Sequence, residues 1–211
     1  MKKATLFVSA LVLGMFVASC GGGTEAKHDD ASHEETHAEE APAGKTGSVT
    51  YDAAASEVVW GGSMIGIKAH EGTIALKEAA LDLENGAVVG GKFVIDMTTI
   101  NPTDSAYDEE HTAEMLVGHL GTGDFFAVEE HPTATFEVTS ADAEAGTVTG
   151  NLTVRGKTNE ETVTDVVVEE GKATGKLVFN RQNYDVAYST GMKDAVISDD
   201  IELDITLVEA K

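Results

Sequence analysis

The most constraining feature of this sequence is a period-two alternation of apolar and polar residues that recurs along residues 47–211. In the segment KFVIDMT (92–98), Phe93, Ile95 and Met97 fall on one face, and the residues between them fall on the other. Three more segments alternate in the same way: TATFEVT (133–139), TVTGNLTV (147–154) and IELDITLV (201–208). Because successive side chains of a β-strand point to opposite faces, the pattern predicts strands with one buried and one solvated face.

Further runs predict additional strands, and short turns fit between them. The candidate strands are residues 48–51, 56–60, 72–77, 79–84, 162–169 and 172–180. The tripeptides ENG, EAG and EEG indicate turns at 84–86, 144–146 and 169–171. A long meander leaves exposed strand edges unless it closes on itself, so we expect an all-β, closed antiparallel barrel of about eight strands in preference to a sandwich. Composition alone does not distinguish the two.

One segment departs from the alternation and predicts a short helical insertion over residues 104–121. Acidic residues at its start suit the positive end of a helix dipole, and glycines mark its end. Its apolar stripe consists of Met115, Leu116, His119 and Leu120. Two adjacent phenylalanines, Phe125 and Phe126, follow this predicted helix directly.

The amino-terminal segment predicts secretion and lipid anchoring. Two lysines precede an apolar run over residues 4–18, which is shorter than the ~20 residues of a membrane-spanning helix and typical of a signal peptide. The run ends in VASC, which resembles the bacterial lipobox, so we expect residues 1–19 to be removed and Cys20 to be acylated. An ordinary signal peptide followed by a chance cysteine is the alternative. Gly21, in place of a retaining aspartate, favours the outer membrane, facing the periplasm or the cell surface.

Residues 20–46 are expected to form an acidic, disordered tether between the acylated cysteine and a domain of residues 47–211. Beyond Cys20 the tether has no aromatic residue and no aliphatic residue larger than alanine, so it cannot bury enough apolar surface to offset its ordering entropy. It contains His28, His33 and His37, which could bind a divalent metal loosely. A plain spacer is the other interpretation.

The charge balance and the single cysteine exclude several classes of function. The formal net charge is −23 and becomes −25 once residues 1–19 are removed, so nucleic acid is not an expected partner. With Cys20 as the only cysteine, the domain has no disulfide, no cysteine-based zinc site and no cysteine nucleophile. Because the chain has no G-x-S-x-G or P-loop motif and residues 47–211 have no H-E-x-x-H motif, we expect a protein that is not an enzyme and needs no cofactor.

Four segments, in order, resemble the YceI-like, polyisoprenoid-binding family in a lipid-anchored bacterial form. They are WGGSMIGIKAHEGTI (60–74), GGKFVIDMTTI (90–100), GHLGTGDFFAVEEHPTATF (118–136) and GNLTVRGKT (150–158). The similarity extends over residues 47–209, nearly the whole predicted domain. It implies a lipocalin-like, eight-stranded antiparallel barrel with a short helical insertion. It also implies a long apolar cavity that takes a polyisoprenoid chain, as in quinones or polyprenyl phosphates.

Residues expected to contact such a lipid come from inward-facing strand positions, the helical insertion, two histidines and two arginines. They are Trp60, His70, Phe93, Ile95, Met97, Leu116, His119, Leu120, Phe125, Phe126, Phe136, Arg155, Phe179 and Arg181. An eight-stranded barrel has room for one small ligand, so the two adjacent phenylalanines either border that cavity or fill the core. The two histidines bind a head group, bind loop backbone, or hold a metal together with Asp108 or Glu109; of these, we do not expect the metal site.

The nature of the lipid head group follows from the cations. Arg155 and Arg181 are the only arginines, and a pyrophosphate prefers bidentate guanidinium donors. Residues 45–211 carry a net charge of −19, which favours a neutral quinone or another uncharged isoprenoid over a polyprenyl pyrophosphate. We therefore expect an envelope lipoprotein that carries or sequesters an isoprenoid lipid. The alternatives are a surface or stress interaction barrel without a lipid ligand, and a metal-binding lipoprotein.

Overall fold

The computed structural model describes residues 44–65, 68–189, 191 and 196–211, which belong to one compact unit, Glu40–Lys211. The predicted signal peptide, Cys20 and most of the predicted tether lie outside the described residues. Within the described part of the chain, no helix is long and apolar enough to cross a membrane.

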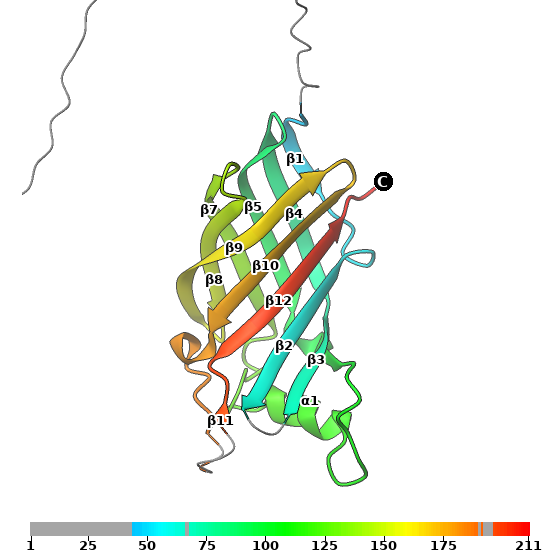
Figure 1. The fold of residues 1–211 in the computed structure, drawn as a ribbon, viewed down its shortest axis with the longest axis vertical. Helices are drawn as coiled ribbons and strands as arrows, with labels where there is room; N and C mark the ends of the chain where they lie inside the picture. Colours follow the sequence, from blue (N-terminus) through cyan, green and yellow to red (C-terminus); the bar gives the residue numbers. More distant parts are fainter. Residues whose placement is uncertain (1–43, 66–67, 190, 192–195) are drawn as a thin grey trace, which may run out of the picture. The chain divides into compact units, whose positions relative to one another are not determined.

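The described residues form one antiparallel sheet of twelve strands, with a single α-helix (Figure 1). The strands are β1 (Gly47–Thr50), β2 (Glu57–Ile65), β3 (Lys68–Ile74), β4 (Leu76–Glu84), β5 (Ala87–Asp96), β6 (Asn101–Pro102), β7 (Thr133–Asp142), β8 (Thr147–Val154), β9 (Lys157–Glu169), β10 (Lys172–Asn180), β11 (Val196–Ile197) and β12 (Asp200–Val208). The helical elements are α1 (Ala113–Gly121) and the 3₁₀ turns η1 (Met97–Thr99) and η2 (Arg181–Tyr184). This arrangement confirms the predicted all-β, antiparallel class with a short helical insertion.

The strand order wraps the sheet around a common interior. It runs β1-β4-β5-β7-β8-β9-β10-β12-β2-β3-β6, and β11 pairs with β2. Only Ala75 separates β3 from β4. On one side of Ala75, Ile74 pairs with Val58 of β2, and on the other side Leu76 pairs with Ile95 of β5. The two ends of the pairing order are therefore joined through one bent stretch of chain.

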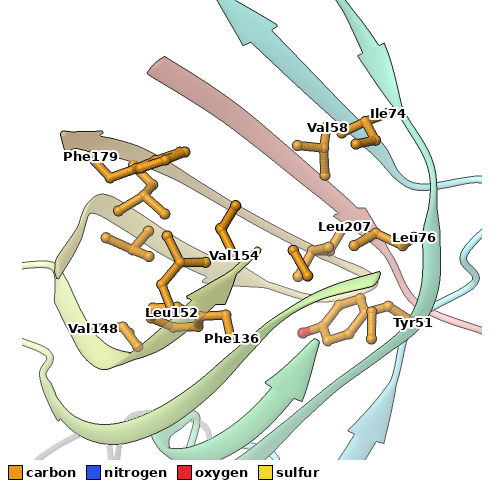
Figure 2. Packing of buried hydrophobic residues seen from close by; sticks show 14 of the residues in the cluster. Tyr51, Val58, Ile74, Leu76, Phe136, Val148, Leu152, Val154, Phe179 and Leu207 are labelled. Atoms are coloured by element: carbon orange, nitrogen blue, oxygen red, sulfur yellow. The ribbon is translucent and has the colours of Figure 1, made fainter. Parts of the chain in front are cut away.

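The hydrophobic core occupies this interior, and it follows the alternation of the sequence. Along β8, Val148, Leu152 and Val154 are buried, whereas Asn151 between them is exposed. Strand β10 repeats the pattern, with Leu177 and Phe179 buried and Val178 between them exposed. Figure 2 shows these side chains converging with residues of β2, β4 and β12. The predicted faces are thus the ones that the fold uses, because burial of the apolar face is what stabilises the sheet.

The helical insertion is shorter than predicted. Helix α1 begins only at Ala113, after Thr112, whose side chain accepts a hydrogen bond from the backbone nitrogen of Met115 at 3.3 Å. In the preceding residues, Asp104 and Asp108 accept hydrogen bonds from backbone nitrogens two or three positions later. Carboxylates placed in this way stabilise turns at the expense of helix, which accounts for the incorrect prediction of helix over 104–112.

The strand predicted over 92–98 also ends earlier, at Asp96. The carboxylate of Asp96 accepts a hydrogen bond from the backbone nitrogen of Thr98 at 3.0 Å and caps the turn η1. Met97 therefore reaches the interior from a 3₁₀ turn instead of from a strand. A local side-chain cap overrides the alternation at this position.

The last residues of the predicted tether contact the sheet. The carbonyl of Lys45 accepts a hydrogen bond from the backbone nitrogen of Gly86 at 2.8 Å. The hydroxyl of Thr46 accepts another from the backbone nitrogen of Asn85 at 3.0 Å. In addition, the ammonium of Lys45 lies 2.5 Å from a carboxylate oxygen of Glu209. Ordered contacts with the folded unit therefore begin before residue 47.

These contacts predict different effects for two deletions. Removing residues 21–43 should leave the melting temperature of a Cys20-free protein unchanged within about 1 °C, because no core-forming side chain is lost. Removing residues 21–46 should lower it by several degrees. Each lost hydrogen bond contributes ~0.5–1.5 kcal/mol, and 1 kcal/mol moves the midpoint of a domain of this size by ~2–4 °C. Differential scanning calorimetry checks both values, and a comparable drop in the two deletions would show that residues before 44 pack on the domain.

Candidate ligand-binding cavity

Two adjoining cavities occupy the interior of the wrapped sheet. The upper cavity lies toward the β4–β5 and β7–β8 turns and measures about 90 Å³. The lower cavity lies toward α1 and measures about 140 Å³. Four residues line both cavities: Val58, Ile95, Leu152 and Leu203. The two are therefore neighbouring parts of one interior space.

The lining of both cavities is apolar. The upper cavity is bounded by aliphatic and aromatic side chains of the surrounding strands, with Thr174 as its one side chain bearing a hydroxyl. The lower cavity is bounded by strand residues together with Ile100, Leu120 and Phe126 from the chain around α1. None of the residues lining either cavity has an ionisable side chain. Such a space suits a hydrocarbon chain and excludes a charged group, which would lose its hydration without compensation.

The volumes limit how much of a ligand fits without movement of the lining. An apolar cavity of ~150 Å³ holds one benzene molecule. On that scale the two cavities together accommodate roughly ten carbon atoms, or about two isoprene units. A longer chain must extend out of the cavities or displace lining side chains.

Eight of the fourteen residues predicted to contact a lipid line one or both cavities. They are Trp60, Phe93, Ile95, Met97, Leu120, Phe126, Phe136 and Phe179. They come from β2, β5, β7, β10, η1, α1 and the chain that follows α1, so segments far apart in the sequence contribute to one space. Their contact with a ligand stays a prediction.

Trp60 is positioned in the lower cavity by a glycine on the neighbouring strand. A side chain at Gly72 would bring its Cβ within 2.5 Å of the Trp60 ring, so only glycine leaves room for the indole there. The indole nitrogen donates a hydrogen bond to the carbonyl of Thr73 at 3.2 Å. Because Trp60 is the only tryptophan of the chain, its fluorescence reports on the cavity directly.

The two adjacent phenylalanines point to different surroundings. Phe126 lines the lower cavity, whereas Phe125 lines neither cavity and is 7% exposed. The Phe125 ring packs instead against His119 and Tyr188, at centroid distances of 4.9 and 5.2 Å. One ring therefore borders the interior space, and the other fills the packing next to α1.

The other predicted contact residues also lie outside both linings: His70, Leu116, His119, Arg155 and Arg181. Leu116 is half-buried on α1. His119 packs edge-on against Tyr188 at 4.7 Å, in the same cluster as Phe125. Helix α1 therefore presents His119 to this aromatic cluster and not to the cavities.

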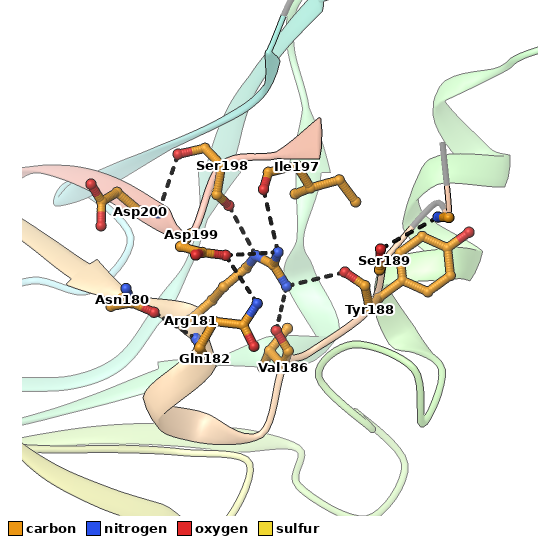
Figure 3. Close-up of polar contacts among 11 residues, drawn as sticks. Asn180, Arg181, Gln182, Val186, Tyr188, Ser189, Ile197, Ser198, Asp199 and Asp200 are labelled. Carbon is orange, nitrogen blue, oxygen red and sulfur yellow. Dashed lines mark hydrogen bonds and ion pairs between the residues drawn. The ribbon is translucent and has the colours of Figure 1, made fainter. Parts of the chain in front are cut away.

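Arg181 is the one buried charged residue among the described positions, and its guanidinium is fully occupied (Figure 3). It donates hydrogen bonds to the carbonyls of Val186 and Ser198 at 2.5 and 2.9 Å, with longer contacts to the carbonyls of Tyr188 and Ile197. It also forms an ion pair with Asp199 at 3.0 Å. Arg181 thus holds the segment after η2 against the start of β12. Its guanidinium has no pair of free N–H groups left to donate to a phosphate.

Arg155 is committed in a similar way at the β8–β9 turn. Its guanidinium donates hydrogen bonds to the carbonyl of Gly123 at 2.5 Å and to the carbonyl of Asp185. It therefore joins the chain after α1 to the chain after η2. Neither arginine lines a cavity, and the contact of both with a lipid head group stays a prediction.

His70 belongs to a polar cluster on the outer side of β3. Its Nδ1 lies 3.2 Å from a carboxylate oxygen of Asp104, which also accepts a 2.6 Å hydrogen bond from the hydroxyl of Tyr107. Burial by itself raises the pKa of the Asp104 carboxyl, but the bonds from Tyr107, from backbone nitrogens and from His70 outweigh it and hold that pKa at about 2. Burial and the bond to Asp104 raise the pKa of Tyr107. The cluster fastens the chain before α1 to β3.

The structure arranges no metal site in the part of the chain that it describes. Residues 44–65, 68–189, 191 and 196–211 contain no group of three or more His, Cys, Asp or Glu side chains that could hold a metal ion. The tether histidines, His28, His33 and His37, lie outside the described residues.

Several lining residues were not among the predicted contacts. Val58, Leu152 and Leu203 line both cavities. Leu152 and Leu203 lie on the predicted inward faces of 147–154 and 201–208. The alternation therefore carried the signal needed to find them, but aromatic residues were favoured over aliphatic ones.

Comparison with known proteins places the whole sheet in one family of domains. The sequence matches the YceI-like domain over residues 49–209. It is 34% identical over 85 residues to a UPF0312 protein of Staphylococcus aureus (strain N315), over 36% of this chain and 48% of the relative. It is 42% identical over 55 residues to a UPF0312 protein of Pseudomonas aeruginosa (strain LESB58), over 25% of this chain and 29% of the relative. The chain thus spans less than half the length of these curated relatives.

One solved structure shares the fold, and a second is more distantly similar. BcnA of Burkholderia cenocepacia matches with a TM-score of 0.58 and 20% identity, over 76% of this chain and 99% of that one. A polyisoprenoid binding domain from Saccharophagus degradans matches with a TM-score of 0.48 and 15% identity, over 78% of this chain and 98% of that one. The similarity to BcnA supports the wrapped antiparallel sheet described above.

Proposed function

The chain belongs to the YceI-like family, and we propose that it binds a neutral isoprenoid-type lipid in its interior and carries or sequesters it, without catalysing a reaction. The observation that carries this proposal is the pair of adjoining cavities whose lining has no ionisable side chain. Each buried methylene contributes ~0.8 kcal/mol, so about ten carbons contribute about 8 kcal/mol before the cost of ordering the ligand. Affinity of this origin needs little recognition of the head group.

We place the cavities in a closed barrel of eight strands. The ring consists of β2, the bent stretch β3–β4, β5, β7, β8, β9, β10 and β12. This closure is supported by the single residue between β3 and β4 and by the pairing of β12 with β2, in which Leu203 faces Trp60. An eight-stranded ring leaves space for one small ligand.

The proposed head group is neutral because neither arginine of the chain is placed to bind an anionic one. The guanidiniums of Arg155 and Arg181 donate to protein carbonyls, and neither lines a cavity. Residues 45–211 carry a net charge of −19. An anionic head group would approach against that field, whereas a quinone or an alcohol would not.

A chain-length series tests this function. Benzoquinones bearing one to four isoprene units should quench Trp60 fluorescence saturably, because a quinone held beside the indole is an efficient quencher. Affinity should rise by about tenfold or more from one to two units, and by less than about threefold for each further unit, because about two units fill the cavities. If none of the four quinones quenches Trp60 saturably, the proposed function is wrong.

We further propose that the protein is anchored in the cell envelope through an acylated Cys20, on the outer membrane. The support is the sequence VASC at residues 17–20, because a protein carrying more than one acyl chain remains stably membrane-bound. Changing Cys20→Ala should transfer the protein from the membrane fraction to the soluble fraction, as measured by immunoblotting of fractionated cells. Retention of the Cys20→Ala protein on membranes after a high-salt wash would contradict the anchor.

A further inference from the structure

The pairing of β5 with β7 stops partway along both strands. Lys92 and Glu137 form the last pair in the direction of the turns. Beyond it, residues 87–91 of β5 and 138–142 of β7 have no pairing with each other in the described structure, although each segment pairs on its other side, with β4 or with β8. Two strand edges with unpaired backbone groups therefore face each other at this level.

Irregularities in both strands coincide with the separation. The β4–β5 ladder shifts register between Asp82 and Leu83, and the β7–β8 ladder shifts between Val138 and Ser140. A β-bulge bends its strand and increases the local twist. Gly91 lies at the same level with a φ of +157°, and a Cβ there would lie 2.7 Å from the carbonyl oxygen of Ala80. The two irregularities and Gly91 thus coincide with the point beyond the Lys92–Glu137 pair at which β5 and β7 separate.

A surface hollow of about 280 Å³ lies at this separation. It is lined by the four short segments 86–88, 141–143, 146–148 and 166–168. Val88, Val148 and Val166 line both this hollow and the upper cavity. The wall that the hollow shares with the upper cavity therefore consists of these three valine side chains.

Another hollow next to the interior is separated from it by intact sheet. It lies beside His70 and shares Gly61 and Gly62 with the lower cavity. There β2 is paired on both sides, since Gly61 faces Glu202 of β12 and Glu71 of β3. A hydrocarbon chain could not cross the backbone at that point without breaking hydrogen bonds. The separation of β5 from β7 requires no such break.

On the basis of the function proposed above, we infer that the lipid chain enters and leaves through this β5–β7 opening, with Val88, Val148 and Val166 as its gate. Val89 and Val167 at the margin are 55% and 48% exposed, which gives the opening an apolar rim. The unpaired backbone N–H and C=O groups of the two edges supply hydrogen bonds for a neutral polar head group. The nearby carboxylate of Asp142 disfavours an anionic one.

Stopped-flow quenching of Trp60 by a benzoquinone with two isoprene units measures passage through the gate. Ala141→Phe narrows the hollow from an exposed position on its wall. It should slow association and release alike by about tenfold, equivalent to a barrier ~1.4 kcal/mol higher, and leave Kd unchanged within about twofold. The matched control is Ala69→Phe, an exposed alanine that lines the hollow beside Gly61 and Gly62, and it should leave both rates unchanged.

A second pair of variants tests the gate in the opposite direction. Val166→Ala removes two methyl groups from the shared wall and should accelerate both rates severalfold. Val128→Ala, a half-buried valine that lines neither the hollow nor the cavities, should not. If the wild type binds saturably but Ala141→Phe and Val166→Ala exchange the quinone at the wild-type rate, or Ala69→Phe slows exchange equally, this opening is not the route. Absence of saturable quenching in the wild type would overturn the proposed function together with the opening.

Discussion

Replacing Arg181 by methionine is expected to lower the free energy of unfolding by about 3–5 kcal/mol, because the carbonyls that the buried guanidinium binds are left without a donor. The guanidinium donates to the carbonyls of Val186 and Ser198 and pairs with Asp199, and the side chain is 5% exposed. Methionine preserves much of the apolar volume but donates no hydrogen bond. Each carbonyl left unsatisfied costs ~1–3 kcal/mol. Urea unfolding followed by far-ultraviolet circular dichroism measures the loss.

Arg155→Met provides the matched control for this prediction. Its guanidinium also donates to two carbonyls, but it lies in solvent-exposed surroundings where water can replace it. Its removal should therefore cost only about 1 kcal/mol. Equal and small losses in the two variants would contradict the structural role assigned to Arg181 and would reopen a role in head-group binding.

The second large effect is expected from the two adjacent phenylalanines, whose truncation should have different consequences. Phe125→Ala removes a ring that is 7% exposed and packed against His119 and Tyr188, and should cost about 3–5 kcal/mol of stability. Phe126→Ala removes a ring that already borders open space, so in the ligand-free protein its cost should be no more than about 2 kcal/mol.

Ligand should reverse the ranking of these two variants. A ligand that binds only the folded state raises the melting temperature by mass action. With the two-unit benzoquinone in excess, the rise should be retained in Phe125→Ala and reduced in Phe126→Ala, because only Phe126 lines the lower cavity. Thermal scans with and without the quinone measure both rises. Identical rises in the two variants would show that Phe126 does not border the bound chain.

Much of the strand layout could be predicted from the sequence because it follows from side-chain periodicity. The faces carrying Phe93, Phe136 and Leu152 are the faces that line the cavities. Periodicity fixes which side of a strand a residue occupies, so eight lining residues followed from alternation and family resemblance together.

The remainder depended on local geometry that periodicity does not carry. Phe125 and Phe126 leave a turn in different directions, which the backbone dihedral angles decide and the spacing does not. The carboxylates of Asp104 and Asp108 turn the chain where charge patterning favoured a helix. Arg181 binds carbonyls up to 17 residues away, and those partners become neighbours only once the sheet has formed. For that reason, the sequence alone favoured a contact between Arg181 and the head group of the ligand.

The central claim is that the interior holds an isoprenoid chain, and mass spectrometry of an organic extract from the detergent-free, purified protein tests it most directly. Wild type should be compared with Ala134→Leu, which adds three carbons at a buried position lining the lower cavity. We predict one neutral prenyl lipid in the extract at up to one molecule per wild-type chain, and a several-fold smaller amount from Ala134→Leu at equal protein concentration. A wild-type extract without any prenyl lipid, or equal amounts from the two proteins, would contradict the claim.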